Sequence, residues 1–235
     1  MAPNQPSRED ILIRVSLWRW IGVVVAPFFL TTIVLTVVFT ATGGQSPVPR
    51  FATGIYSLVS ILIVALLLQQ LSPTTTAEIL PTHVPGRREI GVTVIAILVT
   101  ILIFDPVATF VVGVISGGGG TTDSFNSSIG AAIFIFSSVV IAPVVEEYLF
   151  RGVALDALRS RYGVGIAIVG SSVLFGGIHI LIGGVSGLVS ATLSGFVYAG
   201  MRIKFENLTG TIIAHSANNL YWVLTIAGVI PKIVP

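Results

Sequence analysis

The feature of this sequence that most constrains its fold is a series of long apolar runs separated by short polar segments. A helix of about 20 residues is long enough to cross the hydrocarbon core of a bilayer. Charged residues make up 9% of the chain and the mean hydropathy is +0.98, whereas soluble domains are roughly 25% charged. A water-soluble fold could not cover so much apolar surface, so lipid must be the solvent.

Seven of the runs are long enough to span a membrane. The sequence therefore predicts an all-α fold, a polytopic transmembrane helix bundle of about seven spans. The fourth run is longer than one crossing needs, and Pro143 is expected to kink it. The predicted spans are residues 20–41, 53–71, 89–115, 128–158, 164–182, 185–202 and 208–230.

The basic residues indicate the orientation of this bundle. With the N-terminus inside, ten of the 12 Lys and Arg residues fall in inner segments, and Arg50 and Lys232 fall outside. Inner segments of membrane proteins carry such an excess. We therefore expect an integral protein of the plasma membrane, with a cytoplasmic N-terminus and the C-terminus outside.

Composition excludes several kinds of site. The chain has no Cys, which excludes disulfides, thiolate zinc ligands and a cysteine nucleophile. Its 12 basic residues barely exceed its 10 acidic residues, too small an excess for a nucleic-acid-binding protein. The lipid bilayer is the expected partner, and no nucleic acid is expected.

Ionisable groups inside lipid are costly, so each one needs a reason. Glu147 and Arg151 are four residues apart in the order that favours a helical ion pair. Glu146 lies about 100° around the helix from Glu147 and has no such local partner. This leaves Glu146 as a candidate general base. The alternative is a structural cluster of the three charges at the membrane edge.

Two histidines complete the candidate set. His179 lies in an otherwise uncharged predicted helix, and His215 lies early in the last one, on the same face as Asn219. A single His on an apolar face is more often a hydrogen-bonded core residue than a ligand. Two of them on different helices, together with paired glutamates, favour a shared site.

The order of these motifs resembles that of a known family. Glu-Glu-x-x-x-Arg, Phe-x-x-x-His and His-x-x-x-Asn follow one another as in the CPBP family of intramembrane proteases, also called Abi. That family comprises CAAX prenyl endopeptidases and bacteriocin-processing enzymes. The resemblance covers residues 128–230, which it identifies as a catalytic core of four spans. Residues 1–127 form a region of three spans that match the family only in being apolar, and such spans vary in that family.

The resemblance implies an intramembrane endopeptidase, a metalloprotease if a metal is used. Its substrate would be a membrane-associated peptide or protein. Glu146 would activate the attacking water, with His179 as its partner or as a metal ligand. His215 and Asn219 would bind the metal or hold the oxyanion, and Glu147 and Arg151 would brace the site. Zinc is the expected metal, held by His179, His215 and Glu146, because two His and one carboxylate leave one position for water. A metal-free mechanism is the alternative.

Other functions remain open from the residues alone. Gly184-Val185-Ser186-Gly187 has the G-x-S-G pattern of rhomboid serine proteases, but Ser186 and His215 are predicted at opposite sides of the membrane. Asp105, next to Pro106 in the middle of the third span, could belong to a proton-coupled transporter. A non-catalytic membrane scaffold or immunity protein would keep the bundle without turnover. The concentration of charged groups in the last four spans favours a single reaction site.

Overall fold

The computed structural model describes residues 12, 15–43, 49–116, 128–231 and 233, and every regular element in these ranges is helical. Short π-helical segments, labelled η, interrupt two of the long helices. The elements are α2 (Leu17–Ala41), α3 (Pro49–Gln69), α4 (Pro73–Ile79), α5 (Arg87–Val99), η1 (Thr100–Phe104), α6 (Asp105–Ser116), α7 (Ser128–Phe136), η2 (Ser137–Ile141), α8 (Ala142–Glu147), η3 (Tyr148–Ala154), α9 (Leu155–Phe205) and α10 (Thr209–Ile226).

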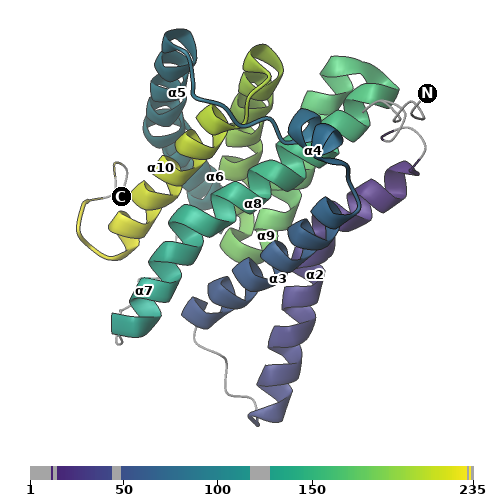
Figure 1. Ribbon diagram of the computed structural model, residues 1–235. Helices are drawn as coiled ribbons and strands as arrows, with labels where there is room; N and C mark the ends of the chain where they lie inside the picture. Colours follow the sequence, from purple (N-terminus) through teal and green to yellow (C-terminus); the bar gives the residue numbers. More distant parts are fainter. Residues whose placement is uncertain (1–11, 13–14, 44–48, 117–127, 232, 234–235) are drawn as a thin grey trace, which may run out of the picture.

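The helices pack into one bundle around the continuous run from α7 to η3 (Figure 1). On one side of this run lie α2 and α3, which contact η3 and α8 respectively. On the other side lies α10, which contacts η2, α8 and α5. The run that carries the two glutamates is therefore covered by helices from both halves of the chain.

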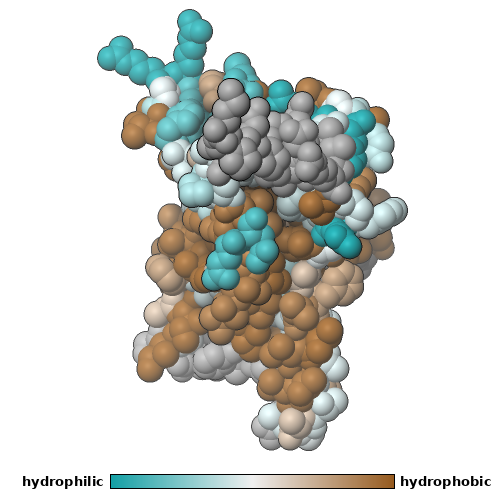
Figure 2. Space-filling view, turned by 45° about the vertical axis from the view of Figure 1, so that its right-hand side comes forward, coloured by the Kyte–Doolittle hydropathy of each residue, from teal (hydrophilic) through white to brown (hydrophobic). Residues whose placement is uncertain are grey.

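Lipid is needed to cover much of the outer surface. Five helical stretches are long and apolar enough to cross a membrane: Leu17–Ala41, Ala52–Gln69, Arg87–Ile115, Ile129–Ile180 and Gly183–Phe205. Between 17% and 44% of each apolar window is buried inside the protein, so most of its side chains face outward. Figure 2 shows the resulting hydrophobic surface over the middle of the molecule, with hydrophilic side chains gathered toward one end. The predicted fold class, a polytopic helical membrane bundle, is confirmed.

The count of five differs from the predicted seven for two reasons. The stretch Ile129–Ile180 is 52 residues long, about 78 Å as a straight helix, and the backbone turns at Gly163 (φ 80°, ψ 175°) between two predicted spans. The last helix, α10, carries His215, Asn218 and Asn219 within its 18 residues and is not among the five apolar stretches. A second turn, at Gly184 (φ 58°, ψ −146°), separates the fifth and sixth predicted spans.

The long fourth helix is shaped by π-helical turns as well as by Pro143. This proline is the second residue of α8, with η2 directly before that helix and η3 directly after it. A π turn holds one residue more than an α turn and is frequent at functional sites. The two glutamates are therefore placed between two local changes of helical register.

Close packing between the fifth and sixth predicted spans generates a stability prediction. A Cβ added to Gly176 would overlap the Thr192 side chain and lie 2.8 Å from the Leu188 carbonyl oxygen, whereas a Cβ on Gly177 meets nothing within 4 Å. Overpacking against backbone costs about 1–3 kcal/mol. Gly176→Ala should therefore lower the melting temperature in detergent, and the matched control Gly177→Ala should leave it unchanged or raise it slightly. Equal melting of the two variants would contradict this packing.

Candidate active site

Three of the predicted residues, Glu146, His179 and His215, meet in the middle of the bundle. They come from three different elements, α8, α9 and α10. The Nε2 atoms of His179 and His215 lie 3.9 Å and 3.6 Å from the same carboxylate oxygen, Oε2 of Glu146. Both distances exceed that of a hydrogen bond, so neither ring is hydrogen-bonded directly to this oxygen.

Both imidazole rings are held through their other nitrogen. His179 Nδ1 is 2.7 Å from the carbonyl oxygen of Phe175, one turn earlier on α9. A carbonyl oxygen has no proton to give, so Nδ1 is the donor and Nε2 keeps its lone pair when the ring is neutral. His215 Nδ1 lies 3.0 Å from Oε1 of Glu147. The two contacts fix which edge of each ring faces Glu146.

Phe175 also positions the rings by packing. Its ring lies edge-on to both imidazoles, with centroid separations of 4.5 Å to His179 and 5.5 Å to His215. The Arg151 guanidinium lies over the same ring, 4.1 Å from its centroid, within the range of a cation–π contact. The first residue of the Phe-x-x-x-His pattern therefore touches three of the charged or titratable groups around the site.

Glu147 forms the predicted ion pair with Arg151. Arg151 Nη1 lies 3.1 Å from Glu147 Oε1, and both side chains are 0% exposed. The same carboxylate oxygen faces His215, so Glu147 links the fourth predicted span to α10. Because neither group reaches solvent, each depends on the other for compensation of its charge.

The structure shows a residue that sequence reasoning missed. Tyr56 on α3 donates its hydroxyl hydrogen to Oε1 of Glu146 over 2.8 Å, so the expectation that Glu146 lacks a local partner holds only within its own helix. Tyr56 is buried against Phe28, with ring centroids 4.7 Å apart. The available signal was the polar group Tyr56, Ser57 and Ser60 inside an otherwise apolar run.

Asn219 lies next to the site but is engaged elsewhere. Its Nδ2 donates to the Ser138 carbonyl oxygen over 2.8 Å. In η2 the Ala142 N–H bonds to the Ser137 carbonyl, and Pro143, the next residue, has no N–H to offer Ser138. Asn219 therefore satisfies the carbonyl that the π turn and the proline leave without a backbone donor.

Ser186 lies just after the turn at Gly184, and its position is explained by that turn. The positive φ of Gly184 identifies the Gly-Val-Ser-Gly segment as a turn between two helices. Within the described residues, no hydrogen bond joins Ser186 to His215. The geometry gives no support to a serine–histidine pair.

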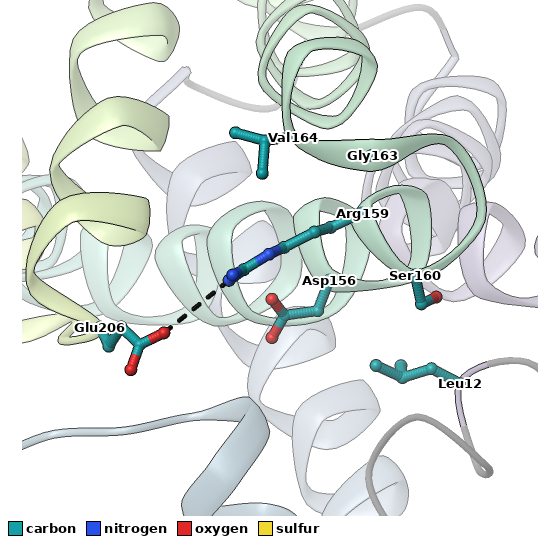
Figure 3. A pocket seen from close by; sticks show the side chains of 7 residues that line it. All are labelled: Leu12, Asp156, Arg159, Ser160, Gly163, Val164 and Glu206. Atoms are coloured by element: carbon teal, nitrogen blue, oxygen red, sulfur yellow. Dashed lines mark ion pairs between the residues drawn. The ribbon is translucent and has the colours of Figure 1, made fainter.

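A cavity lies away from these residues, at the turn formed by Gly163. It measures about 310 Å³, and Figure 3 shows Arg159 reaching across it toward Glu206. This ion pair spans 4.0 Å between side chains that are 35% and 71% exposed, so it contributes little to stability. A buried pair, Arg202 with Asp156 at 3.3 Å, lies beside it. None of the predicted site residues lines this cavity.

The site suits a metal in the chemistry of its side chains. Two imidazole Nε2 atoms and one carboxylate oxygen converge, which is the donor set of many zinc enzymes. Hydrogen bonds on the two Nδ1 atoms match the usual support for metal-binding histidines. In the described part of the chain, no group of three or more His, Asp or Glu side chains is already close enough to enclose an ion.

The different surroundings of the two glutamates predict different effects on stability. Glu147→Gln removes the charge that compensates the fully buried Arg151, at a cost of about 3–5 kcal/mol. Glu146→Gln keeps an oxygen that can accept the Tyr56 hydrogen bond, so its cost should stay within about 1 kcal/mol. Thermal melts of both variants in detergent measure the difference, and equal destabilisation would contradict these assignments.

Comparison with known proteins agrees with this geometry. Residues 128–221 match the family described as type II CAAX prenyl endopeptidase Rce1-like. The matched region contains all three motifs, from Glu146 to Asn219. No curated protein matches the chain. Residues 128–221 are thus an Rce1-like domain of the type II CAAX prenyl endopeptidases, a family of enzymes that cut peptide bonds.

Proposed function

We propose that this protein is an intramembrane endopeptidase in which Glu146 activates the attacking water. The observation that carries the proposal is the convergence of two imidazole Nε2 atoms on Oε2 of Glu146. An ionisable carboxylate inside a membrane bundle marks a functional site, and here Oε2 of Glu146 faces two histidines. The match of residues 128–221 to an endopeptidase family supports the same reaction.

The roles follow from which atoms are engaged. Tyr56 holds Oε1 of Glu146, so Oε2 is the oxygen directed at the two histidines. A water molecule there gives its proton to Oε2 while its oxygen bonds to the carbonyl carbon of the substrate. The carbon–nitrogen bond then breaks and the proton passes from Glu146 to the leaving nitrogen. The products are a carboxylic acid and an amine.

His215 is suited to stabilise the developing charge. The Glu147 carboxylate lies 3.0 Å from Nδ1 and holds the ring in place, in the way a buried aspartate orients histidine in serine proteases. In the metal-free mechanism, Nε2 of His215 would face the oxyanion. Asn219 would act by fixing the carbonyl of Ser138 and thus the helix that carries Glu146.

We propose zinc as the cofactor, with a metal-free mechanism as the alternative. His179, His215 and Glu146 would hold the ion, because their donor atoms converge. A bound zinc ion supplies a Lewis acid that polarises water and the substrate carbonyl. In either case Tyr56, Phe175 and Glu147 keep the roles described above.

The substrate we propose is a membrane-associated peptide or protein. The endopeptidase family is named for prenylated CAAX sequences, and a lipid-anchored substrate suits a site enclosed by apolar helices. We propose residues 128–230 as the catalytic core, with the N-terminal region contributing Tyr56. The excess of basic residues supports a cytoplasmic N-terminus and an outside C-terminus in the plasma membrane.

Loss of any member of the site should eliminate nearly all cleavage of a membrane-embedded reporter peptide. The variants are Glu146→Gln, His179→Ala and His215→Ala. Groups that act as a unit are strongly non-additive, so the double variant of both histidines should be hardly worse than either single variant. The measurement is the initial cleavage rate in proteoliposomes.

The third histidine provides the matched control. His83 is exposed in the segment before α5, and His83→Ala should cleave at the wild-type rate. Full activity of Glu146→Gln would overturn the proposal. Absence of cleavage by the wild type for every peptide tested would favour the scaffold or the transporter.

A chelator separates the two mechanisms. If zinc is used, phenanthroline should inhibit the wild type, and added zinc should restore cleavage. Purified wild type should then contain the metal, whereas His179→Ala should contain much less. Unchanged cleavage in chelator, with a metal-free protein, would support the glutamate–histidine pair alone.

A further inference from the structure

A second cavity is lined in part by α9 and α10, the helices that carry His179 and His215, and plays no part in the chemistry described so far. It measures about 110 Å³ and lies between α6, the last part of α9 and α10. Its volume equals that of roughly three to four molecules of liquid water, at about 30 Å³ each. Its polar lining is unusual for a region between membrane helices: Asp105, Thr109, Ser186, Tyr221 and Thr225, together with Pro106, Trp222 and Ile233.

The carboxylate in this lining indicates what fills the cavity. Asp105 lies within the candidate span Arg87–Ile115 and accepts a hydrogen bond from Ser190 Oγ over 2.9 Å. A carboxylate at that position faces either a partner charge or a water-filled space. Among the described residues, no Lys, Arg or His lies within ion-pair distance of Asp105. Water is the occupant that suits the carboxylate and the surrounding hydroxyl groups.

One wall of the cavity lies just after the turn that follows the fifth predicted span, near the backbone of His179. Ser186 lines the cavity, and its neighbour Gly187 is so close to His179 that an added Cβ would lie 2.6 Å from the His179 carbonyl oxygen. The His179 side chain is also the most open of the three, with 19% exposure against 4% for both Glu146 and His215. His179 is therefore the most accessible of the three side chains.

Another wall of the cavity is formed by α10, the helix that carries His215. Tyr221, Trp222 and Thr225 line the cavity, and Asn218 lies three, four and seven residues before them, on the same face. Asn218 is three residues after His215, and its Oδ1 is buried with no hydrogen-bond partner among the described residues. A water molecule next to Asn218 would satisfy this oxygen.

We propose that this cavity is the water-filled entrance through which the hydrolytic water reaches Glu146. The inference rests on the proposed function, since hydrolysis consumes one water for each bond cut. Water enters from the end of the bundle where α10 ends, is held by Asp105 and the hydroxyl groups, and passes between His179 and Asn218. The helices around the site can then exclude lipid without drying Glu146.

The absence of cysteine in the natural chain allows a direct test. Single variants Thr109→Cys and Thr225→Cys place a thiol on two walls of the cavity, and Phe110→Cys is the matched control. Phe110 is adjacent to Thr109 on α6 but is 71% exposed on the apolar surface of the bundle. In proteoliposomes treated with a charged, membrane-impermeant maleimide, the cavity thiols should react at least about tenfold faster than the control, because only a hydrated thiol ionises.

Modification should also stop the reaction. Each cavity variant is assayed before and after labelling, and the labelled form should lose nearly all cleavage of the reporter peptide. Labelling of both cavity thiols no faster than Phe110→Cys would show a dry cavity and overturn the proposal. Labelling without loss of cleavage would overturn it too, since water would then reach Glu146 by another route. Because labelling is read without turnover, a dry cavity and an inactive enzyme are distinguishable.

Discussion

The structure depends on one constraint, that a carboxylate enclosed by membrane helices must be paired or put to use. Glu147 is paired twice, with Arg151 on its own helix and with His215 on α10. Its neighbour Glu146 receives a hydroxyl hydrogen bond from Tyr56 and otherwise faces two imidazole rings. Adjacent positions on one helix thus separate the two tasks. One carboxylate joins two helices through its ion pairs, and the other is the one to which we assign the reaction.

Sequence reasoning was most successful where the physical signal was local. The lipid solvent, the helical fold and the turn at Gly184 follow from apolar runs and glycine-rich breaks, and the Glu147–Arg151 pair follows from helical spacing. The meeting of Glu146, His179 and His215 is a tertiary contact, which the sequence suggested only through the order of three motifs. Tyr56 was missed because one tyrosine in an apolar run gives no sign of which distant residue it faces. Asn219 was expected to contact the reacting groups. It bonds to a backbone carbonyl that is freed by the combination of Pro143 with a π turn, and side-chain patterns do not encode that combination.

The two halves of the chain contribute unequally to the site. The Rce1-like region supplies the charged and imidazole groups, and α3 supplies the hydroxyl that orients Glu146. This division suits a membrane enzyme, because the costly ionised groups stay together on helices that are close in sequence. Neutral groups from the first helices then complete the enclosure without adding charge to the bilayer.

The π segments set the directions in which the side chains of the fourth predicted span point. Glu147 faces α10 through His215, whereas Asp156, nine residues later, faces the last part of α9 through Arg202. Seven residues of π helix, Tyr148–Ala154, separate these two contacts. Each extra residue turns all that follows by about 100° relative to a regular α-helix. Deleting a single residue from this segment would leave the helix continuous and its outer surface apolar. Glu147 and Asp156 could then no longer face α10 and the last part of α9 at the same time, and one of them would point toward lipid. The number of residues in the segment is therefore set by the positions of these two helices.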